Sequence, residues 1–169
     1  MFRLREIEKR DLPIINRWRN NPKLIEQLGA AYRFIGIEIE EIWFDNYVKN
    51  RANAVRCAMT EDDDVILGVI SLVSIDAVNR SAELHIMIGD DANCNKGMGT
   101  FAIKQMLNHA FNNLNIQRVE LSVLETNERA IHVYEKIGFV KEGVKRRAKY
   151  KGGQFKNMHI YSMLKHEYK

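Results

Sequence analysis

Two glycines and a lysine stand close together in the stretch CNKGMGTFAIKQML, residues 94–107. The pattern predicts a polar loop followed by an amphipathic helix that begins near Met98. A helix N-terminus presents unpaired N–H groups and about half a positive charge. Glycine lets this backbone approach an anion closely, because no Cβ intervenes. Lys96, Gly97 and Gly99 therefore indicate either a phosphate site or an ordinary loop that uses glycine for its turn.

The glycine stretch differs from the two common nucleotide-binding loops. It lacks the lysine–hydroxyl ending of a Walker loop, and the third glycine of the dinucleotide-binding fingerprint is missing. A protein that binds ATP through this loop is therefore disfavoured.

A second chemical feature lies in NERAIHVYEKIGF, residues 127–139. The spacing predicts a helix with Ala130, Ile131, Tyr134 and Ile137 on one face. A phenol with an ordinary pKa of about 10 is protonated at neutral pH and can donate a proton. From its surroundings alone, Tyr134 is either such a donor or a core tyrosine with a satisfied hydroxyl.

Glu83 and His85 stand two residues apart in a predicted strand and so share a face. A glutamate there could take a proton from an amine, directly or through water, or attract a cationic amine. The alternative is a surface ion pair between Glu83 and Arg80 or Lys145.

The elements that must position these residues follow from hydrophobic periodicity and turn signals. Strands are predicted at 2–8, 54–60, 65–76, 81–89, 117–124, 139–150 and 155–164, and helices at 12–20, 38–51, 98–113 and 127–138. Asp11 is expected to cap the first helix, and Asn20–Pro22 to interrupt that helix. The acidic turn after residue 60 and the glycine turn at 151–154 predict two hairpins. The fold class is α/β (α+β), with a mixed sheet flanked by helices.

Length and composition restrict the function classes. The chain has 169 residues, which suits one domain over 1–169. Its net charge of +4 is too small and scattered to predict nucleic-acid binding, although residues 144–153 form a basic run. The two cysteines and the scattered histidines predict neither a disulfide framework nor a metal site. Without an apolar leader or a run of roughly 20 apolar residues, we expect a cytoplasmic protein with no membrane partner.

Two motifs together resemble the GNAT superfamily of acetyl-CoA-dependent N-acetyltransferases. The family's loop pattern is Arg or Gln, two residues, Gly, one residue, and Gly or Ala. Here it reads CNKGMG, with Cys94 in place of Arg or Gln. The family's Asn-x-x-Ala-x-x-x-Tyr-x-Lys-x-Gly-Phe signature is met at Asn127, Ala130, Tyr134, Lys136, Gly138 and Phe139. The order of elements fits across the whole chain, and the overall layout is most similar to the polyamine and ribosomal-protein N-terminal amine branches.

The resemblance implies a splayed central strand pair that binds acetyl-CoA as co-substrate, without a metal. The strand with Ile86, Met87 and Ile88 would pair with the pantetheine arm, and Asn127 would bond it. Tyr134 would protonate the departing thiolate. Glu83 would face the acceptor, with His85 or a water chain as the alternative base. The pyrophosphate would be held by backbone N–H groups of Asn95, Lys96, Gly97, Met98, Gly99 and Thr100.

The expected reaction is direct transfer of an acetyl group to a primary amine. The acceptor is a small amine, such as a polyamine or amino sugar, or a protein N-terminus. A protein at +4 gives a polycation no long-range steering, which weakens the polyamine alternative. A non-catalytic acyl-CoA-binding sensor is the alternative function. A free sheet edge at the C-terminal hairpin would permit a homodimer.

Overall fold

A seven-stranded sheet forms the centre of the computed structural model, which describes residues 1–62, 64–90 and 96–169. The strand order is β1-β2-β3-β4-β5-β7-β6. Only β4 and β5 are parallel, and all other neighbours are antiparallel. The strands are β1 (Arg3–Glu6), β2 (Val55–Thr60), β3 (Ile66–Asp76), β4 (Ser81–Ile88), β5 (Arg118–Leu124), β6 (Val140–Lys151) and β7 (Gln154–Leu164).

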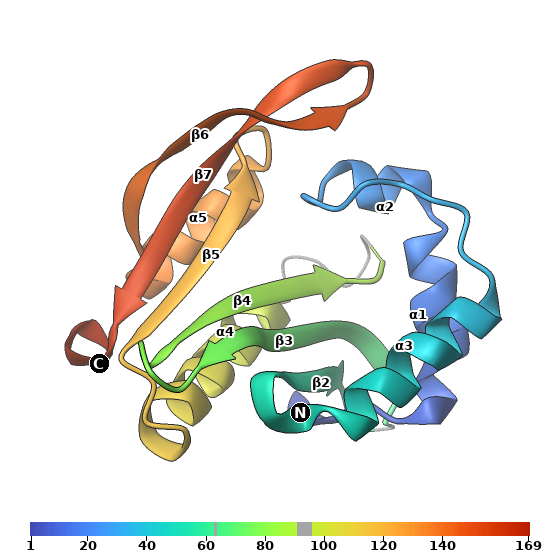
Figure 1. Ribbon diagram of the computed structural model, residues 1–169, viewed down its shortest axis with the longest axis horizontal. Helices are drawn as coiled ribbons and strands as arrows, with labels where there is room; N and C mark the ends of the chain where they lie inside the picture. The colour runs from blue at the N-terminus through green and yellow to red at the C-terminus, as the bar shows by residue number, and fades with distance from the viewer. Residues whose placement is uncertain (63, 91–95) are drawn as a thin grey trace.

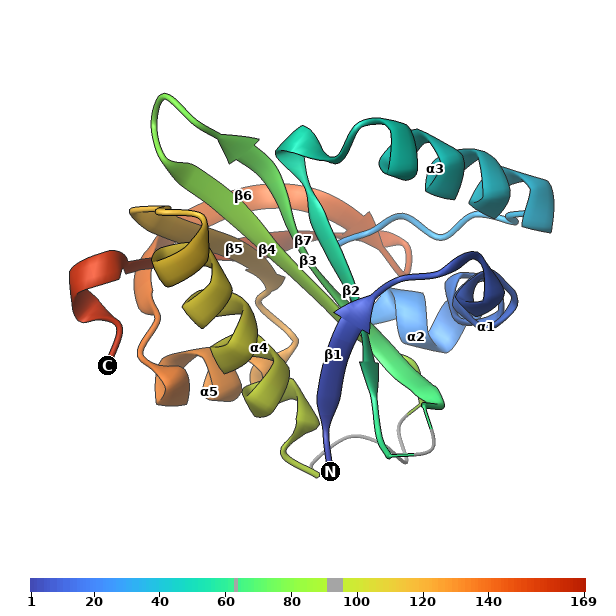
Figure 2. The same cartoon turned by 90° about the horizontal axis from the view of Figure 1, so that it is seen from below.

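Helices cover both faces of this sheet. Figure 2 shows α1, α2 and α3 on one side and α4 and α5 on the other. The helices are α1 (Leu12–Arg19), α2 (Pro22–Glu26), α3 (Ile37–Lys49), α4 (Met98–Asn108) and α5 (Glu128–Ile137). A π-helical turn over His109–Asn113 continues α4. These bounds confirm the predicted mixed sheet with flanking helices.

Strand alternation divides the apolar side chains between the two layers. On β4, Leu84, Ile86 and Ile88 pack in the larger cluster with the core residues of α4. Met87 packs in the second cluster with Trp18 of α1 and Tyr47 of α3. Glu83 and His85 lie four and two positions before Met87, so their side chains project toward the layer of α1 and α3.

The two parallel strands separate part-way along their length (Figure 1). β4 pairs with β5 only from Ser81 to Glu83, opposite Arg118 to Glu120. Beyond that point β4 continues along β3 to Ile88, whereas β5 continues along β7 to Leu124. The splayed strand pair expected from the resemblance is therefore present.

The predicted interruption at Asn20–Pro22 is confirmed, because α1 ends at Arg19. The short helix α2 that follows was not predicted: Pro22 is its first residue, and Asn21 Oδ1 accepts the N–H groups of Lys23 and Leu24. The predicted cap of α1 is corrected by the structure. Asp11 precedes α1 but makes no capping bond to it. Its carboxylate instead binds the Arg5 guanidinium at 2.8 Å.

Both predicted hairpins are confirmed. β2 pairs with β3, and β6 pairs with β7. Gly152 and Gly153 form the second turn with φ of 57° and 78°, values that side chains other than glycine rarely adopt.

Candidate active site

The glycine stretch opens α4 as predicted. Gly97 is the N-cap, with φ of 85°, and its carbonyl accepts the N–H of Phe101 at 3.0 Å. The N–H groups of Met98, Gly99 and Thr100 therefore have no partner within the helix. A Cβ built on Gly97 would meet no described atom within 4 Å. As far as the described residues show, the N-terminus of α4 thus offers N–H donors that an anion can approach closely.

Packing places this helix mouth at the end of β4. A Cβ on Gly99 would lie 3.5 Å from Ile88 Cδ1 and 4.0 Å from Ile86 Cδ1, so α4 begins directly against the separated part of the strand. The exposed Lys96 adds a positive charge beside it. A diphosphate fits these residues. Two residues of the predicted loop, Cys94 and Asn95, lie outside the described part of the chain.

The separated part of β4 leaves a strand edge toward β5. From Leu84 to Ile88, β4 has a ladder partner in β3 but no register partner in β5. The backbone groups on that edge need partners, and an extended arm along Ile86, Met87 and Ile88 could supply them.

Tyr134 lies in the same layer as α4, on the buried face of α5. It is 7% exposed, and its ring contacts Phe139 edge-on with centroids 5.9 Å apart. Burial raises the pKa of Tyr134 to about 12, because an apolar environment disfavours the phenolate. No described residue is hydrogen-bonded to its hydroxyl in the structure. The phenol therefore holds a proton that no neighbouring group shares.

Asn127 has structural partners for both ends of its amide. Its Oδ1 accepts the Ala130 N–H at 3.2 Å, which caps α5. Its Nδ2 donates to the carbonyl of Gln27 at 3.1 Å. This second bond connects α5 to the loop after α2, and no local sequence pattern predicts it. The pantetheine contact of Asn127 stays a prediction.

Glu83 and His85 meet on the layer opposite Tyr134. His85 Nε2 lies 3.0 Å from Glu83 Oε1. The His85 side chain is 57% exposed and the Glu83 side chain is 35% exposed, so both are accessible to solvent. The structure pairs Glu83 with His85, whereas Arg80 Nε donates to the Asn115 carbonyl at 3.0 Å.

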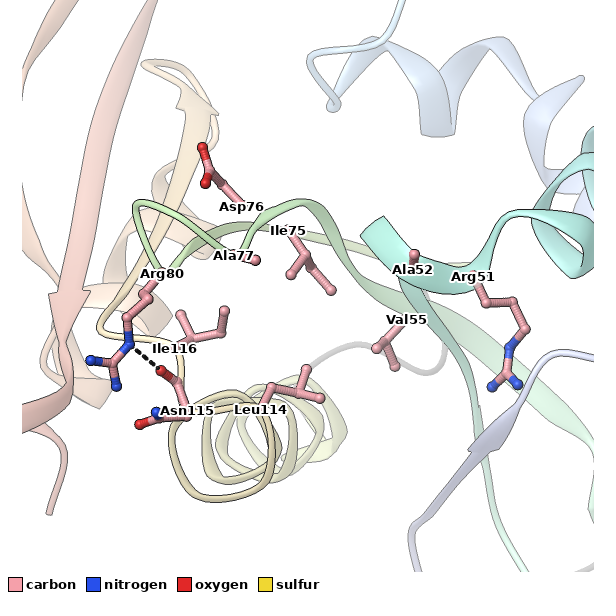
Figure 3. A pocket seen from close by; sticks show the side chains of 10 residues that line it. All are labelled: Arg51, Ala52, Val55, Ile75, Asp76, Ala77, Arg80, Leu114, Asn115 and Ile116. Atoms are coloured by element: carbon pink, nitrogen blue, oxygen red, sulfur yellow. Dashed lines mark hydrogen bonds between the residues drawn. The ribbon is translucent and has the colours of Figure 1, made fainter.

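A separate cavity lies at the other end of β4, where the strands are still paired. It measures about 340 Å³ and is lined mainly by apolar side chains, including Val55, Ile75, Leu114 and Ile116 (Figure 3). It stands beside the turn before Ser81 and is therefore separated by the length of β4 from the mouth of α4.

Two further observations concern the described residues as a whole. They include no group of three His, Cys, Asp or Glu side chains placed to hold a metal ion. In residues 1–62, 64–90 and 96–169, no helix has the length and apolar character needed to cross a membrane.

The family model of the GNAT acetyltransferase domain matches residues 2–140. The chain belongs to this GNAT acetyltransferase family. The match confirms the resemblance inferred from the two motifs, and with it the enzyme class and the co-substrate: this GNAT protein is an acetyl-CoA-dependent N-acetyltransferase.

Individual GNAT relatives agree over most of the chain. The spermidine N(1)-acetyltransferase of Escherichia coli is 29% identical over 166 residues, covering 98% of this chain and 87% of that protein. The enzyme of the same name from Vibrio cholerae is 31% identical over 141 residues, covering 83% and 79%. A Bacillus subtilis protein provisionally named a ribosomal N-acetyltransferase is 36% identical over 106 residues, covering 63% and 57%.

The fold matches solved GNAT structures. The spermidine N-acetyltransferase of Vibrio cholerae, solved in complex with CoA and spermine, superposes with a TM-score of 0.93 at 24% identity. The match covers 99% of this chain and 97% of that one. It shows that the two chains share one fold.

Proposed function

We propose that acetyl transfer takes place in the gap where β4 and β5 part, by direct attack of a primary amine. The observation that carries this proposal is the end of β4–β5 pairing at Glu83, with Tyr134 in one layer and the Glu83–His85 pair in the other. Acetyl-CoA, when bound, supplies the acetyl thioester. The N–H groups of residues 96–100 would hold its diphosphate, and the free edge of β4 would orient its arm.

In the proposed mechanism, Glu83 takes a proton from the amine and Tyr134 gives a proton to the departing sulfur. An alkylammonium substrate first gives one proton to Glu83, which passes it to solvent and leaves a neutral amine. The nitrogen–carbon bond then forms as the carbon–sulfur bond breaks, and the second proton lost by nitrogen balances the one that Tyr134 gives to sulfur. Tyr134 suits the second role because burial keeps it neutral. Glu83 suits the first because it is accessible and held by His85.

The acceptor class is proposed as a small-molecule amine. The spermidine acetyltransferases among the relatives support a small amine, and an amino sugar or a protein N-terminus remains to be tested beside it. The alternative of a non-catalytic acyl-CoA sensor gains no support from these relatives.

The test is thiol release from acetyl-CoA with a panel of primary amines. We expect turnover with at least one amine, and Tyr134→Phe should lower kcat by roughly 100-fold or more while acetyl-CoA affinity stays unchanged. Binding of CoA in a calorimeter without thiol release for any amine would favour the sensor. Unchanged kcat in Tyr134→Phe would remove this residue from the mechanism.

Two features of the wider setting stay predictions. β6 is the outer strand of the sheet, so a second copy could pair with it and form a homodimer, which sedimentation would detect. The cytoplasmic location is likewise an expectation from the sequence.

A further inference from the structure

Arg56 is a half-buried cation between two aromatic rings. Its guanidinium carbon lies 5.0 Å from the ring centre of Trp43 and 5.7 Å from that of Tyr47. Its Nε is buried and has no hydrogen-bond partner. In the described part of the chain no carboxylate forms an ion pair with Arg56, although burying an unpaired charge is costly.

Neighbouring arginines are paired differently. Arg19 Nη1 binds the buried carboxylate of Glu40 at 2.7 Å, and Arg51 Nη2 binds Glu6 at 2.6 Å. Burial lowers the pKa of Arg56, and the nearby Arg19 charge lowers it further. The protein thus keeps an uncompensated guanidinium beside a second cation, an arrangement that an oxyanion would stabilise.

Strand register places Arg56 on the amine side of the sheet. Arg56 on β2 stands opposite Ser71 on β3, and Ser71 stands opposite His85 on β4. Register partners project to the same face, which here is the layer of α1 and α3. Two strand spacings separate the positions of Arg56 and His85, or about 10 Å.

The β6–β7 hairpin adds positive charge near the same layer. Its strands carry seven lysines and arginines and a single carboxylate. Lys145 and Lys149 stand opposite Met158 and Lys156, and the side chains of Met158 and Lys149 pack against Gly29 in the loop after α2. In the described residues, neither Lys145 nor Lys149 forms an ion pair. This field would attract an anion and repel a polycation.

We infer that the acceptor carries an oxyanion, such as a phosphate or carboxylate, which Arg56 binds while the amine lies at Glu83 and His85. This inference rests on the acetyl transfer proposed above and specifies its substrate. The oxyanion and the amine must be separated by no more than about 10 Å, the span of two strand spacings. A polyamine such as spermidine lacks the group that Arg56 would recognise.

The test compares amines that differ only by an oxyanion. Suitable pairs are glucosamine 6-phosphate with glucosamine, and 4-aminobutyrate with 4-aminobutyramide, with spermidine as the polycation. We expect kcat/KM to be roughly 10-fold or more higher for the anionic member of at least one pair, the usual effect of a charge-assisted contact. The pair that responds separates phosphate from carboxylate recognition.

Variants then locate the contact. Arg56→Gln should abolish the preference for the anionic member while leaving kcat/KM for its uncharged partner and the KM of acetyl-CoA within a few-fold of wild type. Arg56→Lys should keep part of the preference. Arg51→Gln is the matched control. It removes an equal charge from a residue that stands five positions before Arg56 and forms an exposed ion pair with Glu6.

The outcomes distinguish the two proposals. Turnover with equal or lower kcat/KM for every anionic member, or a preference that survives Arg56→Gln, would overturn the oxyanion inference and leave acetyl transfer intact. No thiol release with any amine would contradict the acetyl transfer itself. The wild-type comparison decides the inference even if Arg56→Gln fails to fold.

Discussion

At the scale of single residues, the environment of Tyr134 determines when it can donate its proton. An ordinary tyrosine with a pKa of about 10 is half ionised at pH 10. Burial raises the pKa of Tyr134 to about 12, so its neutral form persists well beyond that pH. We predict that kcat does not fall between pH 8 and 10. The check is a pH profile of kcat at saturating substrates. An alkaline loss of activity with a midpoint near 10, in protein that remains folded, would contradict the role of Tyr134.

The proposed base Glu83 gives a prediction about how the effect of its removal changes with pH. Alkylammonium groups have pKa values of about 10, so a base is needed most near neutrality. Glu83→Gln should lower kcat/KM for the amine by roughly 100-fold at pH 7, and the loss should shrink as pH rises and the amine becomes neutral in solution.

His85→Gln is the comparison that assigns the base, since His85 contacts Glu83 at 3.0 Å. If His85→Gln reproduces the pH-dependent loss and Glu83→Gln has little effect, the histidine is the base. If neither variant changes the pH profile of kcat/KM, the base is a water chain and neither side chain.

At the scale of elements, α1 supports the end of β4 through a glycine. A Cβ on Gly89 would overlap the indole of Trp18, which is 1% exposed. Gly89→Ala should therefore force α1 away from β4 and lower the free energy of unfolding by about 1–3 kcal/mol. Thermal unfolding measures this loss. Gly143→Ala on β6 is the control, because a Cβ there would meet no atom within 4 Å. Equal stability of both variants would contradict tight packing of Trp18 on Gly89.

The helices and strands could be predicted from the sequence where the local pattern of apolar and turn residues determines them. Alternating apolar residues located the strands, and Gly138 and the Gly152–Gly153 pair marked ends and turns. The short helix α2 was missed because Asn21 and Pro22, which start it, also occur in turns. Gly97 and Gly99 at the N-terminus of α4, and Tyr134 on α5, were found from sequence motifs.

Arg56 could not be found in that way. In the sequence it is one charged residue in an alternating strand. Its relation to Ser71 and His85 depends on the register of three strands, and its aromatic neighbours come from α3. Register and the packing of a helix on a sheet are set by tertiary contacts, which no local pattern contains.

At the scale of the whole molecule, the two halves of the splayed sheet are joined across the gap by α2 and the loop after it. Lys151 Nζ, at the end of β6, donates to the carbonyl of Ile25 at 2.7 Å and also to that of Ala30. Asn127 binds Gln27 in the same loop. These bonds connect α1 and α2, which pack on the β4 side, to β6 and α5 on the β5 side. These bonds therefore hold the hairpin against the acceptor side of the gap.

Docking of the hairpin can be tested through Lys151. Lys151→Met keeps the length of the side chain but removes the ammonium and its hydrogen bonds to the carbonyls of Ile25 and Ala30, which costs about 1–3 kcal/mol. We expect faster amide hydrogen exchange in α2 and at residues 152–156, and a several-fold higher KM for the amine with the KM of acetyl-CoA unchanged. Lys156→Met is the control, since Lys156 Nζ bonds only Gln154 of its own hairpin. If exchange rises equally in both variants, or if the KM of acetyl-CoA rises with that of the amine, Lys151 does not act by closing the acceptor side.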